Sequence, residues 1–296
     1  MSVDQKPSSQ LMALIEQART RKAMLSSNYD LREMRALALA ATDAEAAREA
    51  NSGGALRIER RGTADGSCSI VFVPGGGYFL PPNDAHRHFI DLISDALNAE
   101  AAIVHHRLSP EHAFPAAYDD VVAALNTIME SAGDKPVLAV ADSSGGALLL
   151  SAMLERRSRG LSNPAACATL SALTDMAMTG LSHVANAEAD PMFGPQAIIH
   201  KSAHYLRGAN PTDPRASPLW SDLSGLPPLL MIAGSTEVML DDSVRFAEKA
   251  RKSGISVTLR TIADAPHSFA YVPGLPEAAA ATAQIISFFR TFVQRP

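Results

Sequence analysis

Ser143 lies in a setting typical of a nucleophilic serine. The apolar run 136–141 predicts a buried strand, and small residues and then a segment with helical potential follow it without a loop. A strand, a tight turn and a helix in this order project the apex side chain above the sheet, provided that the residues two before and two after it are small. Here these residues are Ala141 and Gly145, whereas the usual pattern G-x-S-x-G has glycine at both places. The alternative is an ordinary helix cap, which Ser and Asp also favour.

A nucleophilic serine needs a base to take its proton and a carboxylate to orient that base. In one known chain order the acid and then the histidine follow the serine, each at the carboxyl end of a strand. Glu237 follows the predicted strand 228–233, and His267 follows the predicted strand 256–262. We therefore expect both residues to meet Ser143, while a solvated loop carboxylate is the alternative for Glu237.

The other acidic and thiol groups that we considered have simpler interpretations. Asp241 and Asp242 follow Glu237 at the start of a predicted helix, where they favour the first turn through the helix dipole. Cys68 and Cys167 are far apart and lack metal-ligand spacing, so we expect buried, unreactive thiols. We expect neither a metal site nor a bound cofactor.

Three successive glycines, Gly75 to Gly77, come directly after Pro74 and the predicted strand 69–73. Their backbone N–H groups can converge on one point, which suits an anion or a developing oxyanion. Neither G-x-x-x-x-G-K-[ST] nor G-x-G-x-x-G is present, so a phosphate cradle is disfavoured. A flexible loop is the remaining alternative.

The elements that must position these residues alternate along the chain. Strands are predicted at 55–60, 69–73, 101–105, 136–141, 166–173, 228–233 and 256–262. Helices are predicted at 84–98, up to about 131, after Ser143, at 241–253 and up to about 290. This alternation predicts an α/β fold with right-handed crossovers and a mostly parallel central sheet flanked by helices.

No clear linker divides the chain, yet two segments depart from the alternation. Residues 1–51 carry two predicted helices, which we assign as N-terminal helices that form part of a cap, with simple packing against the fold as the alternative, and residues 52–296 are then the catalytic domain. An insertion around 174–223 interrupts the strands and is rich in Met, so we expect a helical cap over the strand ends.

Composition limits the classes of partner. With 296 residues and 47% hydrophobic content the chain can bury a large core, and its net charge of -5 without a basic block argues against nucleic acid. The first residues do not show the basic stretch followed by an apolar stretch that marks a secretory signal, and no apolar run is long enough to span a bilayer. We therefore expect a cytoplasmic protein without a membrane partner. A small, largely apolar ligand fits best, and the oligomeric state, a homodimer included, stays open.

Five segments together resemble the α/β-hydrolases of the hormone-sensitive-lipase-like branch, the fold-3 bacterial esterases, from about Ser69 onward. The similar segments are Pro74–Tyr78 (H-G-G-G-aromatic), Arg107–His112 (R-L-A-P-E-H), Ala141–Gly146 (G-D-S-A-G-G), Glu237–Asp242 (the catalytic Asp, an apolar pair and an acidic pair) and Pro266–Phe269 (the histidine segment). The resemblance implies an α/β-hydrolase fold with a helical cap. It also implies roles for six residues: nucleophile Ser143, acid Glu237, base His267, and oxyanion-hole N–H donors Gly75, Gly76 and Ser144.

Three residues depart from the family pattern. Pro74 replaces His and removes its side-chain hydrogen bonds to the glycine loop, so other groups must hold that loop. Ala141 replaces Gly at the elbow, and Glu237 replaces Asp and is one methylene longer. None of these changes removes a group that the chemistry requires.

The sequence thus predicts a serine hydrolase that cleaves a small, largely apolar carboxylic ester through an acyl-enzyme, with a lactone or activated amide as related substrates. The alternative is a catalytically silent small-molecule-binding protein on a hydrolase fold. Pro74 and Ala141 favour that alternative, whereas the complete set of Ser143, Glu237 and His267 opposes it.

Overall fold

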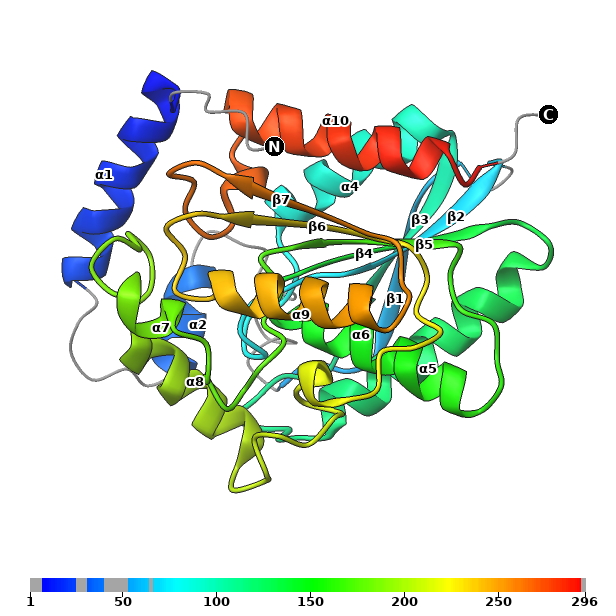
Figure 1. The fold of residues 1–296 in the computed structure, drawn as a ribbon, viewed down its shortest axis with the longest axis horizontal. Coiled ribbons are helices and arrows are strands. Elements are labelled where there is room, and N and C mark those ends of the chain that lie inside the picture. Colours follow the sequence, from blue (N-terminus) through cyan, green and yellow to red (C-terminus); the bar gives the residue numbers. More distant parts are fainter. Residues whose placement is uncertain (1–6, 25–30, 40–52, 64–65, 294–296) are drawn as a thin grey trace.

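The computed structural model describes residues 7–24, 31–39, 53–63 and 66–293, and a seven-stranded sheet forms its centre (Figure 1). The strands are β1 (Arg57–Gly62), β2 (Cys68–Val73), β3 (Ala99–His105), β4 (Val137–Asp142), β5 (Ala166–Leu170), β6 (Leu229–Gly234) and β7 (Val257–Ile262). Their order is β1-β3-β2-β4-β5-β6-β7, with β1 antiparallel to β3 and all other neighbours parallel. The predicted mostly parallel α/β sheet is confirmed.

Helices cover both faces of the sheet (Figure 1). The flanking helices are α4 (Asp84–Leu97), α5 (Ala116–Ala132), α6 (Ser143–Ser158), α9 (Leu240–Lys252) and α10 (Pro276–Arg290). One apolar cluster joins α4 and α10 to one face, and a second joins α5, α6 and α9 to the other. Every residue of β2, β4, β5 and β6 is buried, as expected for parallel strands covered on both sides.

Local sequence explains where the flanking helices begin. The Asn83 side chain accepts the N–H of His86 at 3.1 Å, and His86 Nδ1 accepts the N–H of Asn83 at 3.1 Å, so the two residues form a capping box for α4. Asp241 and Asp242 lie in the first turn of α9 and basic residues lie in its last turn, which agrees with the helix dipole.

Several predicted boundaries differ from the structure by one to three residues; for example, the strand expected at 55–60 spans Arg57–Gly62. The strand expected at 166–173 ends at Leu170, because Ser171 has a φ of +49° and turns the chain out of the sheet. The two expected N-terminal helices are α1 (Ser9–Met24) and α2 (Leu31–Leu39), while residues 25–30 and 40–52 lie outside the described residues.

Additional helices gather at the end of the sheet where β4, β6 and β7 finish (Figure 1). The segment between β5 and β6 contributes α7 (Ser182–Ala185), α8 (Pro195–Leu206) and the short helix η1 (Pro218–Trp220). Helix α1 buries Leu11 and Ile15 in the cluster that also contains Phe269, from the short helix η2 (Phe269–Tyr271). Helix α1 and the inserted segment therefore both lie at this end of the sheet (Figure 1).

Both thiols are part of the core. Cys68 and Cys167 are buried, and burial raises the pKa of each thiol above its usual value. Among the described residues, no helix combines the length and the apolar character needed to cross a bilayer.

Candidate active site

Ser143 occupies a strained turn between β4 and α6. Its φ is +50°, a conformation that non-glycine residues rarely adopt, and helix α6 begins at this same residue. A Cβ atom on Gly145 would lie 2.1 Å from the carbonyl oxygen of Val73, so only glycine fits two residues after the serine. Ala141 is fully buried in β4, and the turn closes with its methyl group in place. The expected elbow is present.

Ser143, His267 and Glu237 form one hydrogen-bonded chain. Ser143 Oγ lies 3.0 Å from His267 Nε2, and His267 Nδ1 lies 2.9 Å from Glu237 Oε2. All three residues are buried, and Glu237 has no exposed surface. The structure thus brings together three residues that are separated by 124 and 30 positions along the chain.

The second oxygen of Glu237 is held as firmly as the first. Glu237 Oε1 accepts the Ser171 hydroxyl at 2.6 Å and the N–H of Gly234 at 2.5 Å. These two donors fix the carboxylate plane, so Oε2 faces the imidazole. Ser171 was not anticipated from the sequence, although the residue that turns the chain after a strand lies at the edge where sites form.

The surroundings of His267 favour its protonated form. Burial lowers the pKa of the imidazole, but the hydrogen bond and the negative charge of Glu237, with smaller contributions from Asp190 and Asp142, outweigh burial and raise the pKa above its ordinary value of 6.5. An imidazolium formed during a reaction is therefore stabilised at this site.

The glycine loop packs directly against the serine. The N–H of Gly75 donates to Asp142 Oδ1 at 2.7 Å, and a Cβ atom on Gly75 would lie 2.7 Å from the Cβ of Ser143. Asp142 is the N-cap residue of α6, yet its side chain makes no hydrogen bond to that helix. Asp142 therefore holds the loop that Pro74 leaves without a histidine, and it engages one of the three predicted oxyanion donors.

Helix α2 holds the far side of the same loop. The guanidinium of Arg35 is fully buried and donates from Nε to the carbonyl of Phe79 at 2.7 Å. Its Nη2 donates to the carbonyl of Ser109 and, at 2.9 Å, to Glu111 Oε2. Arg35 joins the residues after the glycine loop to the Arg107–His112 segment, a role that the sequence did not reveal.

Asp241 and Asp242 do more than favour a helix start. Asp242 is fully buried and accepts the N–H groups of Thr174 and Asp175 at 2.7 and 2.9 Å, while His183 Nε2 lies 3.2 Å from its other oxygen. Asp241 Oδ2 accepts the N–H of Ser182 at 2.9 Å. Both aspartates anchor the segment between β5 and β6 to α9, and within the described part of the chain neither hydrogen-bonds to His267.

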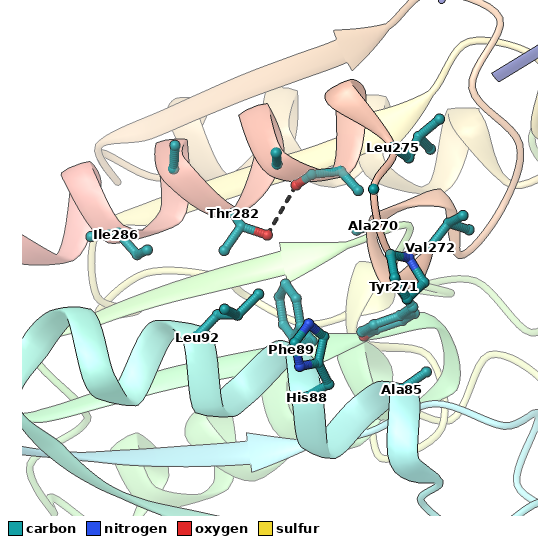
Figure 2. Close-up of a pocket in the computed structure, with 15 residues that line it drawn as sticks. Ala85, His88, Phe89, Leu92, Ala270, Tyr271, Val272, Leu275, Thr282 and Ile286 are labelled. Atoms are coloured by element: carbon teal, nitrogen blue, oxygen red, sulfur yellow. Dashed lines mark hydrogen bonds between the residues drawn. The ribbon is translucent and has the colours of Figure 1, made fainter. Parts of the chain in front are cut away.

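A separate apolar cavity lies behind the histidine segment. It has a volume of about 300 Å3 and opens between α4, α10 and the residues that follow η2. Figure 2 shows Phe89 and Leu92 on one side, Thr282 and Ile286 on the other, and Tyr271 at one end. The residues that line it do not include Ser143, Glu237 or His267, so it is distinct from the hydrogen-bonded chain. Across the described residues, no three His, Cys, Asp or Glu side chains converge as metal ligands.

A hydrogen-bonded Ser–His–Glu chain at the carboxyl edge of a mostly parallel sheet, with the serine on a strand-to-helix elbow, defines the α/β-hydrolases. A family model described as alpha/beta hydrolase fold matches residues 70–271. The chain belongs to this family, in its hormone-sensitive-lipase-like branch of esterases, and is a carboxylic-ester hydrolase.

Individual relatives agree with this assignment. An acetyl-hydrolase of Streptomyces hygroscopicus is 35% identical over 75% of this chain and 75% of its own length. The crystal structure of an esterase/lipase from an uncultured bacterium superposes with a TM-score of 0.82 at 32% identity, covering 96% of this chain and 98% of that one. A hormone-sensitive lipase from a metagenome library gives a TM-score of 0.85 at 28% identity, covering 98% and 100%.

Proposed function

We propose that the chain hydrolyses small, largely apolar carboxylic esters through an acyl-enzyme intermediate on Ser143. The observation that carries this proposal is the hydrogen-bonded chain from Ser143 through His267 to Glu237, with distances of 3.0 and 2.9 Å. In this proposal Ser143 is the nucleophile, His267 the general base and Glu237 the acid that orients the base.

Four proton transfers through His267 complete the cycle, two in acylation and two in deacylation. Ser143 Oγ attacks the ester carbonyl carbon while its proton passes to His267 Nε2, and the resulting imidazolium is stabilised by Glu237. The tetrahedral intermediate then collapses, the carbon–oxygen bond to the alcohol breaks, and the alcohol takes the proton from His267. Water then attacks the acyl carbon while its proton passes to His267 Nε2, the bond between that carbon and Ser143 Oγ breaks, and Oγ takes the proton back from His267, which releases the carboxylic acid and the free enzyme.

Backbone N–H groups beside Ser143 supply the oxyanion hole in this proposal. The N–H of Ser144 lies at the start of the 16-residue helix α6, where the dipole favours negative charge. Gly75 packs on Ser143, and the next residue, Gly76, supplies the second N–H donor in this proposal. The N–H of Gly75 is engaged with Asp142, so Gly75 acts chiefly by bringing the loop against the serine.

The walls near the site favour a small and apolar substrate. The ring of Phe193 lies against His267 with centroids 5.1 Å apart, so the alcohol that leaves beside His267 meets an apolar surface. Tyr78 and Tyr205 stack at 3.7 Å and are buried, which fills the space beyond the glycine loop. The acetyl-hydrolase of Streptomyces hygroscopicus, by its name, acts on an acetyl group, which supports a short acyl chain here. The same steps apply to a lactone or an activated amide.

We also propose that two segments together form the cap of the site. Helices α1 and α2, from the stretch 1–51, and the insertion around 174–223 lie at the strand ends that carry Ser143, Glu237 and His267 (Figure 1). Ligands of open α/β sheets bind at this edge, so a cap here shapes the substrate pocket.

Hydrolysis of p-nitrophenyl acetate tests the proposal. We expect activity in the wild type and a loss of about 10⁴-fold or more in kcat for Ser143→Ala and for His267→Ala. Ser151→Ala is the matched control, because Ser151 is also buried in α6 but donates only to the carbonyl of Pro214. A fluorophosphonate probe should label the wild type and Ser151→Ala but not Ser143→Ala. A well-folded wild type that neither hydrolyses the ester nor reacts with the probe would instead support the binding-protein alternative.

A further inference from the structure

The turn 186–193 of the inserted segment is bound to the loop that carries Glu237. Asn186 Nδ2 donates to the carbonyl oxygens of Ser235 and Glu237 at 3.1 and 2.8 Å. The N–H of Val238, the residue after Glu237, donates to Asp190 Oδ2 at 2.9 Å. Three hydrogen bonds therefore join this turn to the backbone of the acid loop.

Asp190 is the centre of that turn. Its side chain is completely buried, and Oδ1 accepts the N–H groups of Met192 and Phe193 at 2.8 and 2.9 Å while Oδ2 accepts that of Val238. One carboxylate thus satisfies three backbone donors from two segments of the chain. Charge-assisted hydrogen bonds of this kind are about twice as strong as neutral ones, so the geometry of the turn depends on this carboxylate.

The same turn receives a cation from helix α1. Lys22 Nζ donates to the carbonyl oxygens of Ala187, Asp190 and Phe193 at 3.0, 2.6 and 3.1 Å (Figure 1 shows α1 beside α7). The ammonium group of Lys22 thus binds backbone carbonyl oxygens of the turn, whereas the carboxylate of Asp190 binds its backbone N–H groups. The turn is therefore fixed from both sides by charged groups.

Phe193 connects this turn to the imidazole of His267. Its ring meets the imidazole of His267 at 5.1 Å between centroids and 63° between planes, an edge-to-face contact. His267 must keep one orientation to reach both Ser143 and Glu237, and Phe193 packs against the same ring. Movement of Phe193 would admit water and let the imidazole turn.

We propose that Asp190 is a positioning residue of the active site. It holds Phe193 against His267 and holds the backbone beside Glu237, and its negative charge adds to that of Glu237 and Asp142 around the imidazole. This inference rests on the proposed function for its effect on turnover, but its effect on the imidazole is independent of turnover.

Asp190→Asn tests this role, because the amide keeps the shape but turns a donor toward at least one N–H group. We expect kcat for p-nitrophenyl acetate to fall about 10- to 100-fold with KM little changed, because the base is misaligned rather than the substrate lost. Removal of the negative charge also lowers the pKa of His267, so the acid limb of the kcat/KM profile moves to lower pH. The charged groups that face His267 are Glu237 from the loop after β6, Asp142 from the end of β4 and Asp190 itself.

A matched control separates positioning from simple loss of stability. Asp175 is another fully buried carboxylate of the inserted segment that accepts two backbone N–H groups, from Ala177 and Thr179, and its partners include none of the site residues. Asp175→Asn should lower the Tm yet leave the pH profile unchanged. An Asp190→Asn variant with reduced Tm but unaltered kcat and pH profile would overturn the proposal.

Two further measurements keep the test decisive. Phe193→Ala should reproduce the fall in kcat, and in the double variant with Asp190→Asn the two effects should be less than additive, because both act through the same ring. Titration of the His267 imidazole by NMR reports its pKa even if the wild type hydrolyses no ester. A lower pKa in Asp190→Asn then supports the positioning role while the proposed function fails, whereas an unchanged pKa in a folded variant refutes the role itself.

Discussion

Replacement of Glu237 by Gln tests the orientation of the base most directly. Glu237 Oε1 accepts the N–H of Gly234 and the hydroxyl of Ser171, and Oε2 faces His267 Nδ1. The N–H of Gly234 cannot turn, so the glutamine oxygen must take the place of Oε1 and its NH₂ group must face His267. The amide then donates to Nδ1, and the imidazole keeps its proton on Nε2, where it cannot accept one from Ser143.

The magnitude follows from that wrong tautomer. A comparable exchange of the orienting acid for an amide in a serine protease costs about 10⁴-fold in kcat, equivalent to about 5.5 kcal/mol of activation free energy. The reverse placement of the amide would restore the tautomer, but its NH₂ group would then oppose the N–H of Gly234, which lies only 2.5 Å from Oε1, and two buried donors would repel each other there. The wrong tautomer is thus the stable one, and we expect a loss of about 10⁴-fold in Glu237→Gln.

The assay is the steady-state hydrolysis of p-nitrophenyl acetate at a pH well above the pKa of the base. Asp241→Asn is the matched control, because Asp241 is the neighbouring acid of the same loop and helix start but accepts only the N–H of Ser182 in the hydrogen bonds of the described residues. Both variants should be folded by circular dichroism. A Glu237→Gln enzyme within tenfold of the wild type, or an Asp241→Asn enzyme that loses as much, would refute the assignment of the acid.

Three further outcomes are expected. The pKa of His267 is raised above 6.5, and only the neutral imidazole accepts a proton. We therefore expect kcat/KM to fall as the pH drops through a midpoint above 6.5. A stopped-flow pH profile with a lower midpoint would contradict this. Gly145→Ala places a Cβ 2.1 Å from a carbonyl oxygen of β2, so we expect no soluble folded protein, and a normal Tm would contradict the elbow geometry. Arg35→Met should lower the free energy of unfolding in urea titrations by about 3–5 kcal/mol, because Glu111 loses a fully buried cationic partner. Arg32→Met removes a 67% exposed partner of the same carboxylate and should cost about 0–1 kcal/mol. Equal losses in the two variants would refute this reasoning.

Much of the fold was predictable because parallel strands leave a strong sequence signal. The runs Cys68–Val73 and Val137–Asp142 are apolar except for Ser69 and Asp142, since both faces of the sheet are covered, and each predicted boundary falls within one residue of these strands. The strand at 166–170 was overestimated, because Leu173 and Ala172 are apolar and buried although the chain has already left the sheet. Burial alone does not distinguish a strand from a buried turn.

The site was predictable where order along the chain determines position. Ser143, Glu237 and His267 follow three parallel strands, and their carboxyl ends meet at one edge, so the topology brings the residues together. The hydrogen bonds from the N–H of Gly75 to Asp142 and from Arg35 to the carbonyl of Phe79 were not predictable. Each joins a side chain to a backbone group of a distant segment, and backbone groups carry no sequence signature.

Helix α1 has a consequence for the order in which the protein is assembled. Ser8, which precedes α1, donates from its N–H and its hydroxyl to Glu277 at 2.7 and 2.8 Å, across a separation of 269 residues. At about 5–20 residues per second, a ribosome needs roughly 15 to 50 s to make the intervening chain. During that interval the apolar side chains of Leu11 and Ile15 have no partner in the C-terminal helix. Helix α1 is thus made well before α10 but can be fully packed only after α10 has been made.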